Sequence, residues 1–183
     1  MNKTKKYDAS SIEVLEGLEP VRRRPGMYIG GTDNSSMHHL FSEVIDNAMD
    51  EAVANFASFI EVKVEKDNII TVYDNGRGIP IDPHPNFPNK SALEVIMTTL
   101  HAGGKFSNKV YQTSGGLHGV GISVVNALSE FVDVEIYRDK KIYNQKFSKG
   151  HPTSKLKELK KKTNRKGTKV SFKPDPEIFG LDN

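Results

Sequence analysis

The sequence predicts an α+β protein, a two-layer sandwich in which a mostly antiparallel mixed sheet is covered by helices on one face. Residues 35–55 have apolar side chains at i, i+3, i+4 and i+7, the spacing of an amphipathic helix. Several later segments alternate apolar and polar residues, as half-buried strands do. Because helices and strands do not alternate regularly along the chain, a doubly wound parallel sheet is disfavoured.

The N-terminal third is predicted to consist of an arm, a short helix, a loop and one long helix. Residues 1–9 are too polar to bury themselves, so we expect a free arm before a single domain over 10–183. Residues 10–17 predict a short helix, and residues 19–32, rich in proline and glycine, a loop. The apolar stripe of the long helix contains Leu40, Phe41, Val44, Ile45, Ala48, Met49, Ala52 and Val53.

The rest of the chain predicts two further helices and several strands. A helix over 91–101 starts with Ser91 as its cap and Glu94 at the capping-box position. The other predicted elements, in chain order, are strands at 59–64 and 68–74, a glycine-rich loop at 103–121, an apolar helix at 121–129, a hairpin of 131–137 and 141–147, and a strand at 168–173, reached through a basic loop.

Composition excludes several classes of protein. The chain has 183 residues, of which 27% are charged and 36% apolar, a mixture typical of globular domains. No apolar run approaches the roughly 18 residues of a membrane helix, and no apolar segment follows the N-terminal lysines as in a signal peptide. The absence of cysteine excludes disulfides, zinc–thiolate sites and thiol nucleophiles. We therefore expect a cytoplasmic protein without a membrane partner.

Charge is distributed unevenly along the chain. Residues 155–173 contain nine Lys or Arg and one acid, whereas no Lys or Arg lies between Arg24 and Lys63. The acidic part could hold a cation. The basic part could contact a polyanion such as nucleic acid, although a run of like charge is more often a solvated face.

The polar side of the long helix groups residues that could do chemistry. His39, Glu43 and Asn47 are spaced by four and form a column, with Asp46 and Asp50 nearby. An amide oxygen suits a hard cation, and a carboxylate can accept a proton as a general base. His39 could orient Glu43 from one turn away. A solvated acidic face is the alternative interpretation.

Two further motifs complete a candidate nucleotide site. Asp74, at the end of a strand, could accept a hydrogen bond from an exocyclic amine, and Gly78 would let a flat ring approach the backbone; a plain turn is the alternative. The glycine-rich segment 114–121 precedes an apolar helix, as in an anion cradle, and Lys105 could reach a terminal phosphate. Neither a Walker loop nor a dinucleotide fingerprint fits, because the loop lacks Gly-Lys-Ser/Thr and does not follow a strand.

Three motifs resemble the N, G1 and G2 boxes of the Bergerat ATP-binding fold, shared by gyrase, heat-shock chaperones, histidine kinases and mismatch-repair ATPases. They are Glu43–Asn47, Asp74–Pro80 and Gly116–Gly121. Residues 17–29 and 101–106 are similar to the ATPase subunits of bacterial type IIA topoisomerases, the B subunits of gyrase or topoisomerase IV. Residues 107–112 resemble topoisomerase IV slightly more than gyrase.

This resemblance implies that the domain binds ATP and Mg²⁺ and hydrolyses ATP. Glu43 would be the general base supported by His39, Asn47 the magnesium ligand, and Asp74 the adenine ligand through water shared with Thr168. The lid would span 103–121. The other implied ATP contacts are Tyr7, Gly78, Lys105, Gly116, Leu117, His118, Gly119, Val120, Gly121 and Ile122, and the rim for aminocoumarin-type inhibitors would be Arg77, Pro80 and Arg138.

The resemblance also implies the setting of the domain. Type IIA subunits are far longer, and a homodimer of B subunits assembles with A subunits on DNA, where ATP closes the dimer for strand passage. We therefore expect residues 1–9 to be a dimerisation arm and 10–183 an excised ATP-binding domain, mainly monomeric. Without the transducer lysine that contacts the γ-phosphate, hydrolysis should be slow. A histidine kinase, or a nucleic-acid-binding module using residues 155–173, remains an alternative.

Overall fold

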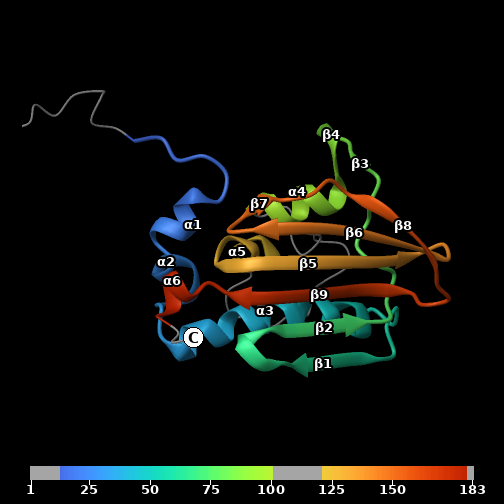
Figure 1. Cartoon of the computed structure of the whole chain (residues 1–183), viewed down its shortest axis with the longest axis horizontal. Helices are drawn as coiled ribbons and strands as arrows, with labels where there is room; N and C mark the ends of the chain where they lie inside the picture. The colour runs from blue at the N-terminus through green and yellow to red at the C-terminus, as the bar shows by residue number, and fades with distance from the viewer. Residues whose placement is uncertain (1–12, 101–120, 181–183) are drawn as a thin grey trace, which may run out of the picture.

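The structure, a computed structural model, describes residues 13–100 and 121–180. Its main sheet has the strand order β1-β2-β9-β5-β6-β7, with β8 also paired to β6 (Figure 1). The strands are β1 (Ile60–Val64), β2 (Ile70–Asp74), β5 (Ser129–Arg138), β6 (Lys141–Ser148), β7 (His151–Pro152), β8 (Lys157–Lys162) and β9 (Gly167–Pro174). Every pairing among the described residues is antiparallel.

Helices cover one face of this sheet, so the predicted two-layer α+β sandwich is confirmed (Figure 1). The three that pack on it are α3 (Asn34–Val53), α4 (Ala92–Thr98) and α5 (Ile122–Ala127). Asp33 caps α3 by accepting a hydrogen bond from the Ser36 amide, 2.7 Å away. The smaller elements are α1 (Glu19–Arg23), α2 (Gly26–Ile29), α6 (Pro176–Phe179), the 3-10 turn η2 (Lys66–Asn68) and the hairpin of β3 (Pro83–His84) and β4 (Phe87–Ser91).

The hydrophobic core lies between the helices and the sheet. Leu40 from α3, Leu93 from α4 and Val124 from α5 are fully buried against Val132 and Phe172 of the central strands. Each such side chain contributes about 1.5–3 kcal/mol through burial. A smaller cluster on the opposite face contains Tyr73, Tyr137 and Ile142, with Leu159 packed against it. The site described below lies on the helical side, next to the larger core.

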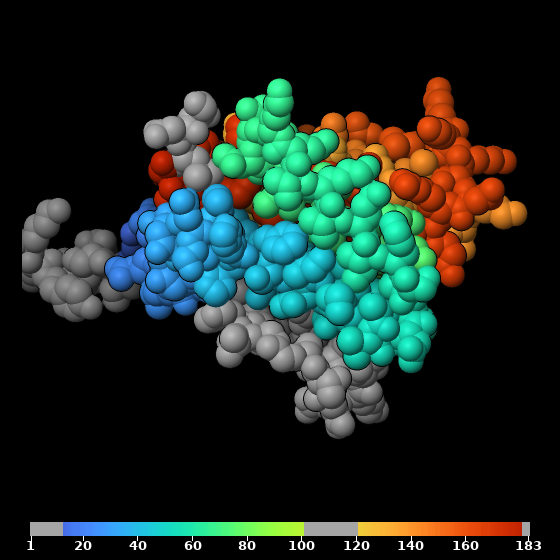
Figure 2. Space-filling model, turned by 90° about the horizontal axis from the view of Figure 1, so that it is seen from below, coloured from blue at the N-terminus to red at the C-terminus, as the bar shows by residue number. Residues whose placement is uncertain are grey.

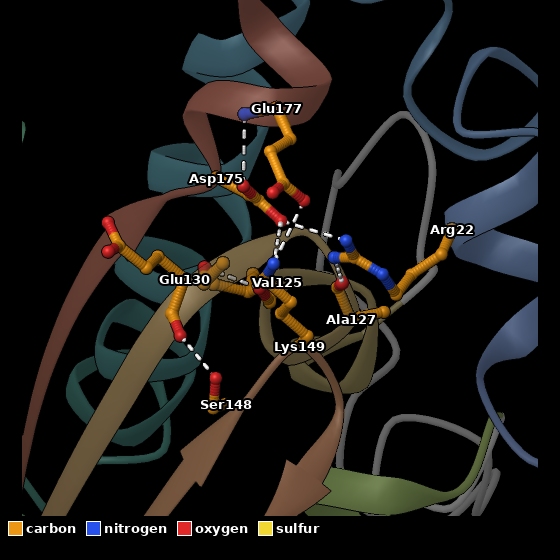
Figure 3. Close-up of polar contacts among 9 residues, drawn as sticks. Arg22, Val125, Ala127, Glu130, Ser148, Lys149, Asp175 and Glu177 are labelled. Atoms are coloured by element: carbon orange, nitrogen blue, oxygen red, sulfur yellow. Dashed lines mark hydrogen bonds and ion pairs between the residues drawn. The ribbon is translucent and has the colours of Figure 1, made fainter. Parts of the chain in front are cut away.

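The ends of the described chain are joined by a polar cluster (Figure 3). Arg22 of α1 donates to the carbonyl of Ala127 at 2.7 Å and to the carboxylate of Asp175 at 2.8 Å. Asp175 is 1% exposed and also caps α6 by accepting from the Glu177 amide at 3.0 Å. Lys149 contributes a longer contact of 4.0 Å to the same carboxylate. The cluster therefore fastens α1 to the segment that joins β9 and α6.

Several local predictions are wrong. Residues 19–32 contain α1 and α2 rather than a loop alone, because Pro20 stands in the first turn of a helix, where its missing N–H breaks no bond. Residues 13–16, predicted as part of a helix, are not helical. The basic segment before β9, predicted as a loop, contains the strand β8. The predicted helices at 91–101 and 121–129 are present but shorter.

The apolar stripe of α3 is buried only over part of its length. Leu40, Val44 and Ala48 are buried, whereas Met49 and Val53 are 46% and 63% exposed. Seen from below, α3 (light blue to cyan) forms part of the outer surface (Figure 2). The periodic pattern thus extends beyond the region where the sheet covers the helix.

Candidate functional site

A pocket of about 920 Å³ lies between α3 and the strands β2, β9 and β5. Its lining includes Asn47 and Glu51 from α3, Asp74 from β2, Arg77, Gly78 and Pro80 from the following loop, Ile122 from α5, Arg138 from β5 and Thr168 from β9. Apolar side chains from α3, β2 and β9, among them Ala48, Val72 and Val170, line it as well. An apolar pocket with a few convergent polar groups is the usual form of a small-molecule site.

Asp74 is the buried carboxylate of this pocket. It is the last residue of β2, pairs with Thr168 of β9 in register, and is 6% exposed. Burial raises its pKa to about 6, the charge of Glu51 adds to this, and a hydrogen bond from the Gly76 amide at 2.9 Å opposes it. A carboxylate with a perturbed pKa in a pocket is typical of a functional group. Near pH 7 it is mostly ionised and acts as an acceptor.

The loop after Asp74 is fastened to the neighbouring strands. Gly78 has a φ of +78°, and a Cβ at this position would lie 3.1 Å from Arg138 Cγ. The Gly78 carbonyl accepts from Arg138 Nη1 at 2.9 Å, and the Ile79 amide donates to Thr168 Oγ1 at 3.0 Å. The backbone that lines the pocket is therefore held by both β5 and β9. Gly78, Arg138 and Thr168 line the same pocket as Asp74.

Gly167 is a site residue that sequence reasoning missed. Its φ is +114°, and a Cβ there would overlap the carbonyl oxygen of Asp74. Only glycine allows β9 to approach the end of β2 this closely. The sequence contains no local signal for this, because the two residues are 93 positions apart and meet only through strand pairing.

Glu51 is a second residue that was missed, and it fixes Arg77 at the rim. Its carboxylate accepts from Arg77 Nη2 at 2.6 Å, from Arg77 Nε at 3.1 Å and from the Arg77 amide at 3.0 Å. Burial opposes ionisation of Glu51, but the bonds and charge of Arg77 outweigh it, so the pKa of Glu51 lies below its usual value. The Arg77 guanidinium also stacks 3.8 Å from the ring centroid of Phe56. The rim is thus held in one geometry.

Glu43 does not lie on a solvated acidic face. It is 5% exposed, and its carboxylate accepts a hydrogen bond from the Gly121 amide at 3.1 Å. Gly121 immediately precedes α5 and has a φ of +85°. The fold therefore brings the predicted general base next to the end of the predicted phosphate loop. His39 lies half-buried one turn earlier on α3, and Asn47 lines the pocket one turn later.

Part of the predicted site lies outside the described residues. This holds for Tyr7, Lys105, Gly116, Leu117, His118, Gly119 and Val120, and with them for most of the predicted lid and the arm. Within the described residues, no group of three or more His, Cys, Asp or Glu side chains could hold a metal ion. No helix in that part of the chain is long and apolar enough to cross a membrane.

Comparisons with known proteins agree on the family of proteins to which this chain is similar. A family model described as "Histidine kinase-, DNA gyrase B-, and HSP90-like ATPase" matches residues 32–178. The chain is 66% identical over 174 residues to the B subunit of DNA topoisomerase 4 from Bartonella bacilliformis, covering 95% of this chain and 25% of that protein. It is 56% identical over 174 residues to the B subunit of DNA gyrase from Thermotoga maritima, covering 95% of this chain and 27% of that protein.

Solved structures agree with this. The crystal structure of the 43K ATPase domain of Thermus thermophilus gyrase B in complex with an aminocoumarin matches with a TM-score of 0.77 and 47% identity, over 91% of this chain and 41% of that one. The chain spans about a quarter of the length of the curated relatives described above. By the family model that covers most of its length, the chain belongs to the histidine kinase-, DNA gyrase B- and HSP90-like ATPases.

Proposed function

We propose that the pocket binds ATP with the adenine amino group on Asp74. The observation that carries this is a buried carboxylate at the end of a strand, in a pocket that is also lined by Gly78 of the following loop. A buried carboxylate that lines a pocket favours a ligand with a matching donor. Thr168, which pairs with Asp74 in register and lines the same pocket, would share the water that joins them to the base.

The triphosphate would extend toward Gly121 and α5. Ile122, the first residue of α5, lines the pocket, and residues 116–122 would wrap the phosphates with Lys105 on the terminal one. Tyr7 of the arm would reach the site of a partner protomer. Arg77, Pro80 and Arg138, which line the outer part of the pocket, would form the aminocoumarin rim. The aminocoumarin complex of the Thermus thermophilus gyrase B domain supports binding of such an inhibitor by this fold.

Glu43 would act as the general base for hydrolysis. Its carboxylate would accept a proton from water as the water oxygen attacks the γ-phosphorus and the bond to the ADP oxygen breaks. Its contact with the Gly121 amide places it beside the predicted phosphate loop. His39, one turn earlier, would help to orient it.

Asn47 would hold Mg²⁺. Magnesium commonly takes one or two protein oxygens and completes its shell with phosphates and water, so a single amide beside the pocket fits without an acidic cluster. When bound, the ion would neutralise charge on the phosphates. Asn47 itself would orient that ion relative to Glu43 on the same helix.

For the whole protein, we propose a B subunit of a type IIA topoisomerase, with residues 1–9 as the dimerisation arm and 10–183 as the ATP-binding domain. The 66% identity to a topoisomerase 4 subunit against 56% to a gyrase subunit favours topoisomerase IV. ATP would close a dimer of B subunits, assembled with A subunits, during passage of DNA in the bacterial cytoplasm.

Calorimetric titration with a non-hydrolysable ATP analogue and Mg²⁺ tests the nucleotide site. We expect the wild type to bind and Asp74→Asn to bind at least about tenfold more weakly, because its amide presents a donor where the adenine amino group needs an acceptor. Asp82→Asn, an exposed carboxylate in the same loop, is the control and should bind normally. Equal binding by wild type and Asp74→Asn would refute the adenine assignment. Glu43→Gln should keep binding but lose hydrolysis about 10²–10⁴-fold.

A further inference from the structure

One end of the sheet carries a basic surface that overlaps the candidate nucleotide pocket only at Lys140, Arg165 and Lys166. It is formed by the tip of the β5–β6 hairpin, by β8 and by the turn from β8 to β9, which lie together at the right of Figure 1 and in orange at the right of Figure 2. We call it the basic surface; its residues are Lys140, Lys141, Lys157, Lys160, Lys161, Lys162, Arg165 and Lys166, and all eight are exposed.

Acids do not balance this charge. Among the residues that the structure describes, the ion pair found within the basic surface joins Lys141 to Glu158, at 3.6 Å with both side chains half exposed. The other acid in these segments is Asp139. The open face of the sheet beside it is different, because Lys169, Lys146 and Lys173 each pair there with a carboxylate. Paired lysines are therefore the rule on the neighbouring strands, and the basic surface departs from it.

The strand register concentrates the charge. Lys162 of β8 lies directly opposite Lys141 of β6, and like charges in that position destabilise a sheet. The register then shifts, so that the next pair is Ile142 with Leu159, and Lys160 and Lys161 fall in the bulge between the two pairs. Three successive exposed lysines thus lie in one short stretch of edge strand.

Protection of the sheet edge does not explain this arrangement. Lysines on an edge strand discourage pairing with other chains, and so does a bulge. The bulge at Lys160 and Lys161 already interrupts β8, and the basic residues continue beyond the strand at Arg165, Lys166 and Lys140. A sheet that keeps a like-charge pair in register, with further exposed lysines around it, is typical of a site kept for binding rather than for stability.

The surface is also held rigid. The Thr163 amide donates to the Lys140 carbonyl at 3.1 Å, which joins the turn from β8 to β9 to the tip of the β5–β6 hairpin. The Tyr73 hydroxyl donates to the Lys166 carbonyl at 2.8 Å, and the Arg165 guanidinium lies 4.8 Å from the Tyr73 ring centroid. A ligand would therefore meet a preorganised array of charges, with little entropy lost in ordering it.

We propose that the basic surface binds the sugar-phosphate backbone of duplex DNA without reading its sequence. A concentrated group of exposed lysines fits a polyanion with closely spaced phosphates, and point charges position a duplex without specifying bases. The basic surface itself contains no aromatic side chain on which an unpaired base could stack. The inference deepens the proposed function and rests on it for the choice of DNA as the polyanion.

Fluorescence anisotropy with a labelled 20-bp DNA duplex, titrated at several salt concentrations, tests the proposal on the 183-residue chain. We expect binding whose affinity falls with salt, and a Lys160→Glu/Lys161→Glu/Lys162→Glu variant whose salt slope is reduced by about 3 and whose affinity at low salt is at least about tenfold weaker. The control Lys63→Glu/Lys66→Glu/Lys90→Glu has the same net charge and changes exposed lysines elsewhere, so it should bind like the wild type.

Two outcomes would overturn the proposal directly: no salt-dependent binding of the duplex by the wild type, or an equal loss of affinity in both triple variants. A third is displacement of the labelled duplex by polyglutamate as effectively as by unlabelled duplex, which would indicate an acidic protein as the partner instead. Titration of the same three proteins with the ATP analogue separates this test from that of the nucleotide site. Normal nucleotide binding with no duplex binding rejects only the DNA inference, and the reverse rejects only the assignment of the pocket.

Discussion

At the scale of single residues, Asp74 shows how burial couples a binding group to stability. Its pKa rises from 3.8 to about 6 on folding, mainly because burial disfavours the charged form. The folded chain therefore holds a proton on Asp74 more readily than the unfolded chain does. Stability contributed by this proton is present below pH 4 and is lost as the pH rises through 6. The ionised carboxylate that the proposed adenine contact needs thus exists at the expense of folding free energy.

We predict that Asp74→Asn stabilises the chain at neutral pH. Asparagine keeps an acceptor for the Gly76 amide but has no charge to bury, so the free energy of unfolding at pH 7.5 should rise by about 2 kcal/mol. At pH 4 the difference from wild type should nearly vanish. Urea unfolding at both pH values measures it, with exposed Asp82→Asn as the control. A difference that is the same at pH 4 and 7.5 would contradict the raised pKa.

Asp74 also illustrates which site residues a sequence motif can predict and which it cannot. Asp74 and Glu43 were found because each stands in a short motif whose chemistry is local. The burial of Glu43 and the contribution of Glu51 were not found, because charge patterns on a helix do not show which acids a distant segment will cover. Gly167 was missed for a related reason, since its requirement for glycine arises from the approach of β9 to Asp74.

At the scale of elements, the turn between β8 and β9 is held in place by a residue on the open face of the sheet, the face opposite the helices. Residues 163–166 line the outer pocket, and Gly167 and Thr168 follow directly as the β9 neighbours of Asp74. Tyr73, on the face opposite the pocket, holds this turn through its bond to the Lys166 carbonyl and its contact with Arg165. We therefore expect Tyr73 to act as a positioning residue for nucleotide binding without touching the ligand.

Tyr73→Phe should weaken binding of the ATP analogue about fivefold, the equivalent of one lost hydrogen bond of about 1 kcal/mol. Tyr143→Phe removes the same atom from a half-buried tyrosine of β6 and should leave affinity unchanged. Calorimetry well below the melting temperature gives the affinities, and urea unfolding gives the stabilities. If Tyr73→Phe lowers stability while the affinity stays at the wild-type value, the hydroxyl is structural only.

Elements were predicted well where periodicity dominates and poorly where composition misleads. The α3 helix and the β5–β6 hairpin follow their patterns closely. The strand β8 was missed because four lysines in six residues suggest a solvated loop, although pairing with β6 makes it a strand. The short helices α1 and α2 were missed because proline and glycine, which usually break structure, here stand at helix ends.

At the scale of the whole molecule, the sheet order joins distant parts of the chain. Periodicity and the absence of regular helix–strand alternation were enough to predict the two layers. They could not predict that β9 inserts between β2 and β5, because that pairing depends on which apolar faces complete a common core. The pocket exists only because of this insertion, since it brings Thr168 beside Asp74.

The Arg22–Asp175 contact closes the fold by linking its first helix to its last segment (Figure 3). We predict that Arg22→Ala lowers the free energy of unfolding by about 3 kcal/mol, because a carboxylate that is 1% exposed loses its nearest cation. The neighbouring Arg23 is the matched control: its partners Glu13 and Glu19 are exposed, so Arg23→Ala should change stability by less than about 1 kcal/mol.

Urea unfolding of both variants at pH 7.5, followed by circular dichroism, decides between two accounts of this contact. A large loss in the free energy of unfolding that is confined to Arg22→Ala means that Asp175 depends on the guanidinium and that α1 is an integral part of the domain. Small and equal losses would mean that Lys149 at 4.0 Å and the Glu177 amide satisfy Asp175 without Arg22. In that case α1 would separate from the rest of the described domain at little cost in free energy.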